Sequence, residues 1–178
     1  MIRKHPFPAP LTQSFVNQCV EGVAASLAAE LQRVLDIASK DVAVGRLELI
    51  VHAWEAALRF PMMCFVYGHD GAALESDLAC SRVLDHHGPL LPATYADLPI
   101  GRADVAGADF TPESSWVETE LIACVCAAWR EIGSRCRPDL EVLVGTAFMG
   151  YGPREPDQFR LLNLRTGAWE TFERRPNP

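Results

Sequence analysis

The chain has 178 residues, of which 49% are hydrophobic, and its formal net charge is −7 at pH 7. A chain of this length can bury about two-thirds of its unfolded surface in one core, so we expect a single domain. No apolar run approaches the roughly 18 residues of a membrane helix, and an acidic chain is a poor partner for phosphates, so we expect neither a membrane nor nucleic acid as a direct partner.

The first ten residues combine positive charge with three prolines, where a secretory signal would carry an apolar run. We therefore expect a flexible segment over 1–10 and a cytoplasmic protein. From Leu11 to Ala38, apolar residues recur every three or four positions, which predicts one long amphipathic helix.

Two strands are predicted next. Residues 45–54 alternate, with Leu47 and Leu49 on one face and Arg46 and Glu48 on the other, which predicts a strand with one wet or partly covered face. The apolar run over 61–67 predicts a second strand that is buried on both sides.

The next segment, 72–84, has apolar residues near helical spacing, which predicts a shorter helix. His86 and His87 would lie in or just past its last turn, and Gly88-Pro89 would end it. Residues 88–113 then contain seven Gly or Pro and have no sustained period, which is typical of a functional loop or a disordered segment.

Ser115 and Glu118 have the spacing of a capping box, and the apolar period after them predicts a helix that ends before Gly133. Three strands are predicted after this helix, at 140–150, 158–164 and 168–172. The turn at 165–167 joins the last two, so we expect them to be antiparallel neighbours.

The order of these elements predicts an α+β fold rather than a doubly wound parallel sheet. We expect a single domain over 11–175, with a mostly antiparallel sheet of about five strands packed with about three helices. A long acidic loop at 88–113 would interrupt it.

The sequence allows two classes of function: a small enzyme that depends on a metal ion or a cysteine, and a non-catalytic binding protein. One short stretch contains six residues whose side chains could bind a divalent metal ion: His69, Asp70, Asp77, Asp85, His86 and His87. Their spacing matches neither a helical zinc pair nor a calcium loop, so surface histidines are the better explanation. We therefore expect no metal and no cofactor.

The six cysteines, Cys19, Cys64, Cys80, Cys124, Cys126 and Cys136, include no Cys-x-x-Cys pair, and we expect them to be reduced thiols. A nucleophile such as Cys64 or Cys80 could still meet a base such as His69 or His87 in space. A buried thiol in an apolar strand is more often inert, so we expect no catalytic residues.

Negative charge is concentrated in the middle of the chain. Between residues 70 and 120 there are two bases, Arg82 and Arg102, and ten acids: Asp70, Glu75, Asp77, Asp85, Asp97, Asp104, Asp109, Glu113, Glu118 and Glu120. This stretch therefore carries −8 and the rest of the chain +1, which favours a basic protein as the partner, although acids also keep a surface soluble.

We predict that acidic side chains of this stretch and neighbouring aromatic rings form the partner-binding surface. Aromatic rings rimmed by charge are typical of interface anchors, but these rings could instead pin the loop to the body. The predicted residues are Asp85, Tyr95, Asp97, Asp104, Asp109, Phe110, Glu113, Trp116 and Glu118.

A small acidic α+β chain without catalytic motifs resembles, in its general layout, the immunity proteins that protect bacteria from polymorphic or contact-delivered toxins. The resemblance implies a tight complex with a toxin domain, often a nuclease, whose basic site is blocked by carboxylates. It transfers no residue roles. An acidic secretion chaperone is a close variant of the same hypothesis.

Overall fold

The computed structural model describes residues 10–74, 88–96, 112–148 and 157–174. The helices and strands are α1 (Gln13–Lys40), β1 (Val44–Val51), β2 (Met62–Gly68), α2 (Pro112–Ile132), β3 (Glu141–Phe148), β4 (Asp157–Asn163) and β5 (Trp169–Arg174). Short 3-10 turns lie at Ala53–Glu55 (η1), Ala93–Tyr95 (η4) and Gly133–Arg135 (η5). The predicted α+β class is confirmed.

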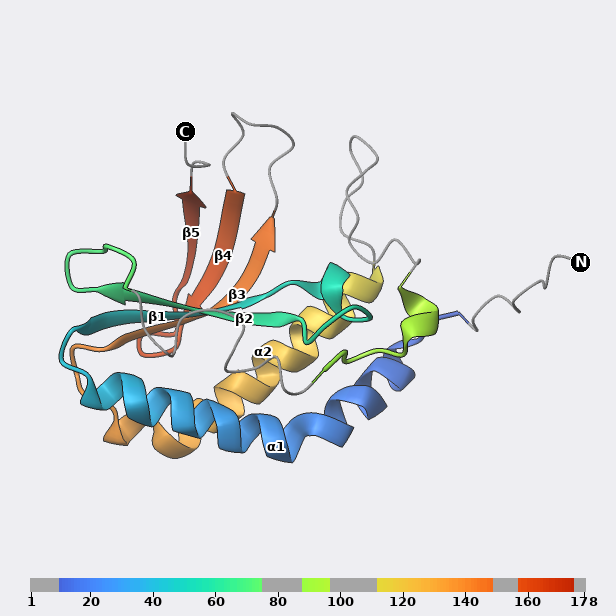
Figure 1. The fold of residues 1–178 in the computed structure, drawn as a ribbon, viewed down its shortest axis with the longest axis horizontal. Coiled ribbons are helices and arrows are strands. Elements are labelled where there is room, and N and C mark those ends of the chain that lie inside the picture. The colour runs from blue at the N-terminus through green and yellow to red at the C-terminus, as the bar shows by residue number, and fades with distance from the viewer. Residues whose placement is uncertain (1–9, 75–87, 97–111, 149–156, 175–178) are drawn as a thin grey trace, which may run out of the picture.

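The five strands form one mixed sheet in the order β2-β1-β3-β4-β5 (Figure 1). β1 and β3 are parallel, and the other three pairs are antiparallel, so the sheet is mostly antiparallel as predicted. A parallel pair needs a long crossover connection, and α2 lies within the connection that leads to β3.

The described residues hold two α-helices, where the sequence predicted about three. The predicted helix over 72–84 is wrong at its start, because residues 72–74 run along the edge of β2. Leu74 donates its backbone N–H to Val66 O at 2.9 Å, and Gly68 donates to Ala72 O at 2.9 Å. Pairing with β2 thus satisfies these backbone groups. The rest of the predicted helix falls on residues 75–87, which lie outside the described part of the chain.

The first helix, α1, begins one residue after Thr12, whose Oγ1 accepts a hydrogen bond from Phe15 N at 3.3 Å. This side chain satisfies one of the N–H groups that a helix start leaves without a backbone partner. The predicted apolar stripe is buried, including Val20, Leu27 and Leu31.

The second helix, α2, begins at Pro112 rather than at Ser115. The predicted capping box is therefore wrong, since Ser115 and Glu118 both lie inside the helix. Proline suits a first helical position because its missing N–H would have no intrahelical partner there. The predicted apolar face is confirmed, and Val117 and Leu121 are fully buried.

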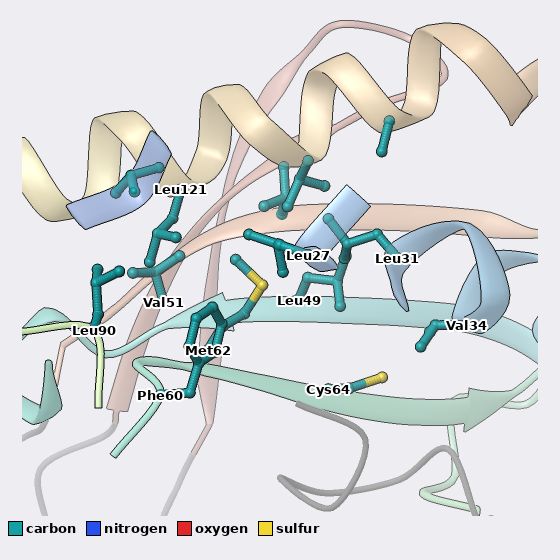
Figure 2. Packing of buried hydrophobic residues seen from close by; sticks show 14 of the residues in the cluster. Leu27, Leu31, Val34, Leu49, Val51, Phe60, Met62, Cys64, Leu90 and Leu121 are labelled. Carbon is teal, nitrogen blue, oxygen red and sulfur yellow. The ribbon is translucent and has the colours of Figure 1, made fainter. Parts of the chain in front are cut away.

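Both helices pack on one face of the sheet and enclose the main core (Figure 1). Leu27 and Leu31 of α1 lie between Leu49 of β1 and Leu121 of α2 (Figure 2). Met62 of β2 belongs to the same core cluster.

A second apolar cluster lies on the opposite face of the sheet. It consists of Ile50, Leu143, Phe159 and Leu161, with Phe65 and Phe172 packed against it. The face of β1 predicted to be wet or partly covered is therefore covered, since even Glu48 is only 1% exposed. Met63 and Phe65, which were predicted to be buried in β2, are only partly buried.

The hairpin between β4 and β5 follows the prediction. Gly167 has φ +73°, and its N–H donates to Asn163 O at 2.8 Å. A left-handed backbone at this position favours glycine, so the Arg-Thr-Gly sequence predicted the turn correctly.

Candidate functional site

Only some of the nine predicted partner-binding residues are described. Asp85, Asp97, Asp104, Asp109 and Phe110 lie outside the described residues. Glu113 lies in the first turn of α2, but its side chain is not described. Tyr95, Trp116 and Glu118 are the members whose surroundings are seen.

Tyr95 packs inward. It belongs to η4, is 8% exposed, and lies against Phe15 of α1 with ring centroids 5.7 Å apart. Just before it, Leu90 and Leu91 are buried, and Leu91 donates its N–H to Ala56 O at 2.7 Å. This stretch is therefore fixed to the body of the protein.

Trp116 also packs against the main core, although it is only partly buried. Both described rings thus hold the chain to the body, as the alternative interpretation of the aromatic residues proposed. Their role in partner binding stays a prediction.

These contacts place the two flanks of the segment 97–111 at one end of the molecule. We call this end the anchor end and define it by Leu11–Phe15, Ala53–Arg59, Leu90–Ala96 and Pro112–Leu121. η4 lies beside the start of α1, and the start of α2 lies close to η1 (Figure 1). The segment that carries Asp97, Asp104 and Asp109 therefore begins and ends at the same end of the fold.

Among the described residues of the anchor end, Glu118 has the pKa that is shifted most from its ordinary value. Its Oε1 is buried and has no hydrogen-bond partner among the described residues. Burial raises the pKa of this carboxyl from 4.5 to about 7. Desolvation disfavours the charged form of an acid, so Glu118 is partly protonated at neutral pH and carries less negative charge than its sequence position indicated.

Sequence reasoning missed Leu58, which is 63% exposed at the anchor end. It follows η1 and lies next to an ion pair between Arg59 and Glu55. An exposed leucine beside charged groups can contribute apolar contact to an interface, but no periodic pattern marks it in the sequence.

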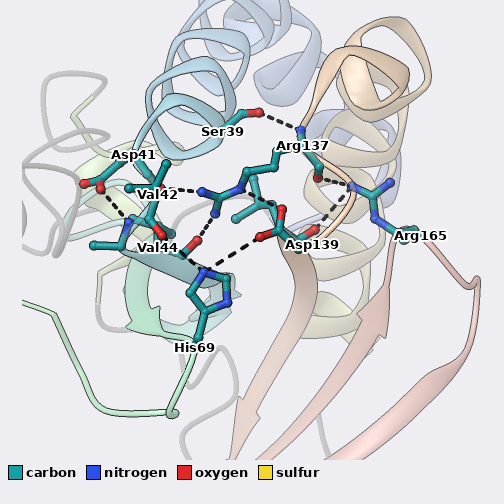
Figure 3. Close-up of polar contacts among 10 residues, drawn as sticks. Ser39, Asp41, Val42, Val44, His69, Arg137, Asp139 and Arg165 are labelled. Carbon is teal, nitrogen blue, oxygen red and sulfur yellow. Dashed lines mark hydrogen bonds and ion pairs between the residues drawn. The ribbon is translucent and has the colours of Figure 1, made fainter.

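The opposite end of the sheet is held by Arg137 (Figure 3). Its guanidinium donates to Asp41 O at 2.9 Å and to Val44 O, and its Nε lies 2.9 Å from Asp139 Oδ1. Its backbone N–H donates to Ser39 Oγ at 2.7 Å. One side chain thus connects the end of α1 with the starts of β1 and β3.

Arg165 and His69 extend this arrangement. Arg165 donates to Arg137 O at 2.9 Å and to Leu140 O at 3.3 Å, so the β4–β5 turn is held as well. His69 Nε2 lies 3.2 Å from Val42 O and 3.9 Å from Asp139 Oδ2. We call the set of Ser39, Asp41, Val42, Val44, His69, Arg137, Asp139 and Arg165 the Arg137 end.

Of the residues proposed for a metal site, His69 and Asp70 are described. His69 contacts the Arg137 end, and Asp70 Oδ1 accepts a hydrogen bond from Ala72 N at 3.0 Å in its own turn. Within the described ranges no group of three or more His, Cys, Asp or Glu side chains could hold a metal ion. Asp77, Asp85, His86 and His87 lie outside those ranges.

The five described cysteines are free thiols, and Cys80 lies outside the described residues. Cys64 is fully buried in the main core. Burial raises the pKa of the Cys19, Cys124, Cys126 and Cys136 thiols. A raised pKa leaves less thiolate, which is the reactive form, so these four thiols are poor nucleophiles at neutral pH.

A groove of about 450 Å³ lies between the C-terminal parts of the two helices. Arg33, Asp36 and Arg135 are among its lining residues, and Arg33 pairs with Glu30 at 2.6 Å while Asp36 pairs with Lys40 at 2.6 Å. The groove thus carries both signs of charge and does not favour a ligand of one charge.

Across the described segments, no helix is both long and apolar enough to cross a bilayer. Comparison of the chain with models of known protein families, with curated proteins and with solved structures finds no match.

Proposed function

We propose that this protein is a non-catalytic, cytoplasmic binding protein of the immunity type. In this proposal it neutralises a basic partner protein, such as a toxin nuclease domain, by covering the partner's positive surface with carboxylates. Opposite charge speeds the encounter of two proteins, and buried contacts then set the lifetime of the complex.

The anchoring of both flanks of the acidic segment supports the proposal. Tyr95 and its neighbours fix the chain on one side, and Val117 and Leu121 fix it on the other, within the same apolar core. Recognition residues are commonly carried by irregular segments that a rigid scaffold positions. Asp97, Asp104 and Asp109 fall between these two fixed points in the sequence.

The exposed Leu58 adds an apolar contribution to the same end. Charge alone gives fast but short-lived encounters, whereas an interface of lasting affinity also buries apolar side chains. We include Leu58 in the proposed surface, together with the predicted acidic residues. Glu118 contributes less charge at neutral pH because burial raises its pKa to about 7.

A charge-reversal variant tests the proposal. Asp104, Asp109 and Glu113 are changed together to Lys, and the association rate is measured with the purified basic C-terminal domain of a secreted protein encoded beside this chain. We expect association to be slower by about tenfold or more, because steering depends on the sign of the surface charge.

A second triple variant controls for net charge alone. Glu21, Glu131 and Glu170 lie away from the anchor end and are changed to Lys, so the net charge moves by the same amount. Equal slowing in both folded variants would contradict the proposed location of the surface. An absence of binding by the wild-type chain would contradict this partner class.

A further inference from the structure

The proposed function does not use the groove between the C-terminal parts of α1 and α2. Its volume is about 450 Å³, within the roughly 300–1,000 Å³ that is typical of small-molecule sites. The polar lining consists of Gln32, Arg33, Asp36 and Ser39 on α1, and of Arg135 and Cys136 beyond the end of α2. Ser39 also accepts the backbone N–H of Arg137, so the groove adjoins the Arg137 end (Figure 3).

Arg135 gives the groove a positive charge that has no partner among the described residues. It lies in η5 and is exposed. Its guanidinium makes no hydrogen bond or ion pair with the described part of the chain, whereas those of Arg137 and Arg165 are bonded to backbone carbonyl oxygens. The planar fork of N–H donors on an arginine matches a carboxylate. Arg135 is therefore available to bind a carboxylate in the groove.

Arg33 brings a second guanidinium to the groove from α1. Its Nε and Nη2 donate to Glu30, one turn earlier on the same helix. Its Nη1 donates to no residue of the described ranges, and the side chain is 50% exposed. The donors on Nη1 are therefore free for a second carboxylate.

Asp36 provides a negative charge in the same lining. Its Oδ2 pairs with Lys40 at 2.6 Å, but the two side chains are 61% and 75% exposed, so water screens this ion pair. Burial raises the pKa of the Cys136 thiol, and Arg135 and Asp36 both act on this thiol electrostatically. The two charged groups therefore lie near the same point of the groove. An ammonium group beside Asp36 would lie close to a carboxylate bound by Arg135.

The charges of the lining indicate the charges of a ligand. Two arginines and one aspartate line the groove, so its formal charge is +1. The nearby Glu131 is held by Gln32, whose Nε2 donates to Glu131 Oε2 at 3.0 Å. An inorganic anion would leave Asp36 unmatched, and a simple cation would leave both arginines unmatched. Charge complementarity therefore favours a small ligand with two anionic groups and one cationic group.

We propose that this groove binds an acidic α-amino acid. The two carboxylates of the ligand contact Arg135 and Arg33, and its ammonium group contacts Asp36. The ligand thus matches the lining with charges of opposite sign in equal number. Binding is non-covalent, and hydrogen bonds between ionised donors and acceptors are stronger than those between neutral groups. An amino acid with an uncharged side chain would leave one arginine without a partner.

Isothermal titration calorimetry of the purified full-length chain tests the proposal, with L-glutamate and L-aspartate as the probes. We expect saturable binding of at least one of them with a Kd of about 1 mM or lower. No saturable binding of either amino acid in this range would overturn the proposal. The assay needs no partner protein, so its failure leaves the proposed function untouched.

Two analogues of the bound amino acid separate its charged groups. The side-chain amide, glutamine or asparagine, lacks one carboxylate, and the N-acetyl derivative lacks the ammonium group. Each should bind about tenfold or more weakly, because each leaves a charged group of the lining without its partner. Equal binding of either analogue would overturn the proposal. Equal binding of the N-acetyl derivative would point instead to an acidic side chain within a protein, which also lacks the ammonium group.

Arg135→Gln and Asp36→Asn test the location of the site. Arg135 has no hydrogen bond to lose and Asp36 has an exposed ion pair, so both variants should fold. We expect each substitution to weaken binding by about tenfold or more. Arg130→Gln is the control, because Arg130 is exposed in the last turn of α2 and does not line the groove. Wild-type affinity in Arg135→Gln or in Asp36→Asn would overturn the proposal.

Discussion

At the Arg137 end, one guanidinium contacts two backbone carbonyl oxygens and a carboxylate, whereas at the anchor end Glu118 Oε1 is buried without a hydrogen-bond partner among the described residues. Burying a polar group is costly unless it is hydrogen-bonded. At the Arg137 end, the two carbonyl contacts offset that cost and join segments more than 90 residues apart, although Arg137 Nε, 2.9 Å from Asp139 Oδ1, lacks hydrogen-bond geometry.

The contacts of Arg137 therefore stabilise the Arg137 end. At the anchor end, the burial of Glu118 has an electrostatic cost that no hydrogen bond among the described residues offsets. Glu48 makes the same point within the sheet, because it is 1% exposed but lies 3.2 Å from Arg46 Nε. Glu118 has no comparable base among the described residues.

The largest expected effect is at the Arg137 end. Arg137→Ala should lower the free energy of unfolding by about 2–4 kcal/mol, because it leaves the carbonyl oxygens of Asp41 and Val44 without their donor. Urea denaturation followed by circular dichroism measures the loss. Arg137→Lys keeps the charge but not the planar fork, so we expect an intermediate value. A loss below about 1 kcal/mol for Arg137→Ala would show that these contacts do not stabilise the fold.

A smaller effect, of opposite sign, is expected at the anchor end. Because burial raises the pKa of Glu118 to about 7, folding favours the protonated form; the cost is absent below pH 4.5 and complete above pH 7. Glu118→Gln should therefore raise the free energy of unfolding at pH 8 by about 2 kcal/mol and much less at pH 5.

The measurement for Glu118→Gln is urea denaturation at several pH values. Glu21→Gln, on the exposed side of α1, is the matched control and should leave the pH dependence of stability unchanged. A Glu118→Gln variant with the same pH dependence as the wild type would show that Glu118 is ionised in the folded protein without penalty.

The smallest effect is expected for the exposed acid of the Arg137 end. Asp139 is 57% exposed, so its ion pair with Arg137 is screened by solvent. Asp139→Asn should lower the free energy of unfolding by less than about 1 kcal/mol, and added salt should reduce the difference further. A loss as large as that of Arg137→Ala would show that the carboxylate, rather than the two carbonyl contacts, is the main contribution.

Much of the fold could be predicted from local patterns. The period of α1 and the alternation of β1 predicted their elements because such periods follow from the local geometry of helices and strands. The glycine of the β4–β5 turn predicted the hairpin because a left-handed backbone favours glycine. The start of α2 was placed wrongly at Ser115, since a capping-box spacing can also occur inside a helix. The segment 72–74 was misread because its backbone partners lie on β2.

The candidate site was predicted less well. The acidic residues were chosen by charge, which cannot distinguish an exposed carboxylate from a buried one such as Glu118. Tyr95 and Trp116 were chosen as aromatic neighbours of the loop, and the structure places both against the body. Leu58 is exposed in the connection between η1 and β2, and a single sequence does not reveal this.

The sequence by itself determined the class of the fold and the positions of most of its elements, because the periods of helices and strands are local properties. Tertiary structure alone decided the parallel pairing of β1 with β3, the burial of Glu118 and the partners of Arg137, whose carbonyl acceptors lie 96 and 93 residues away. Such contacts depend on how distant segments pack, and that packing sets which polar groups lose water and which find a partner.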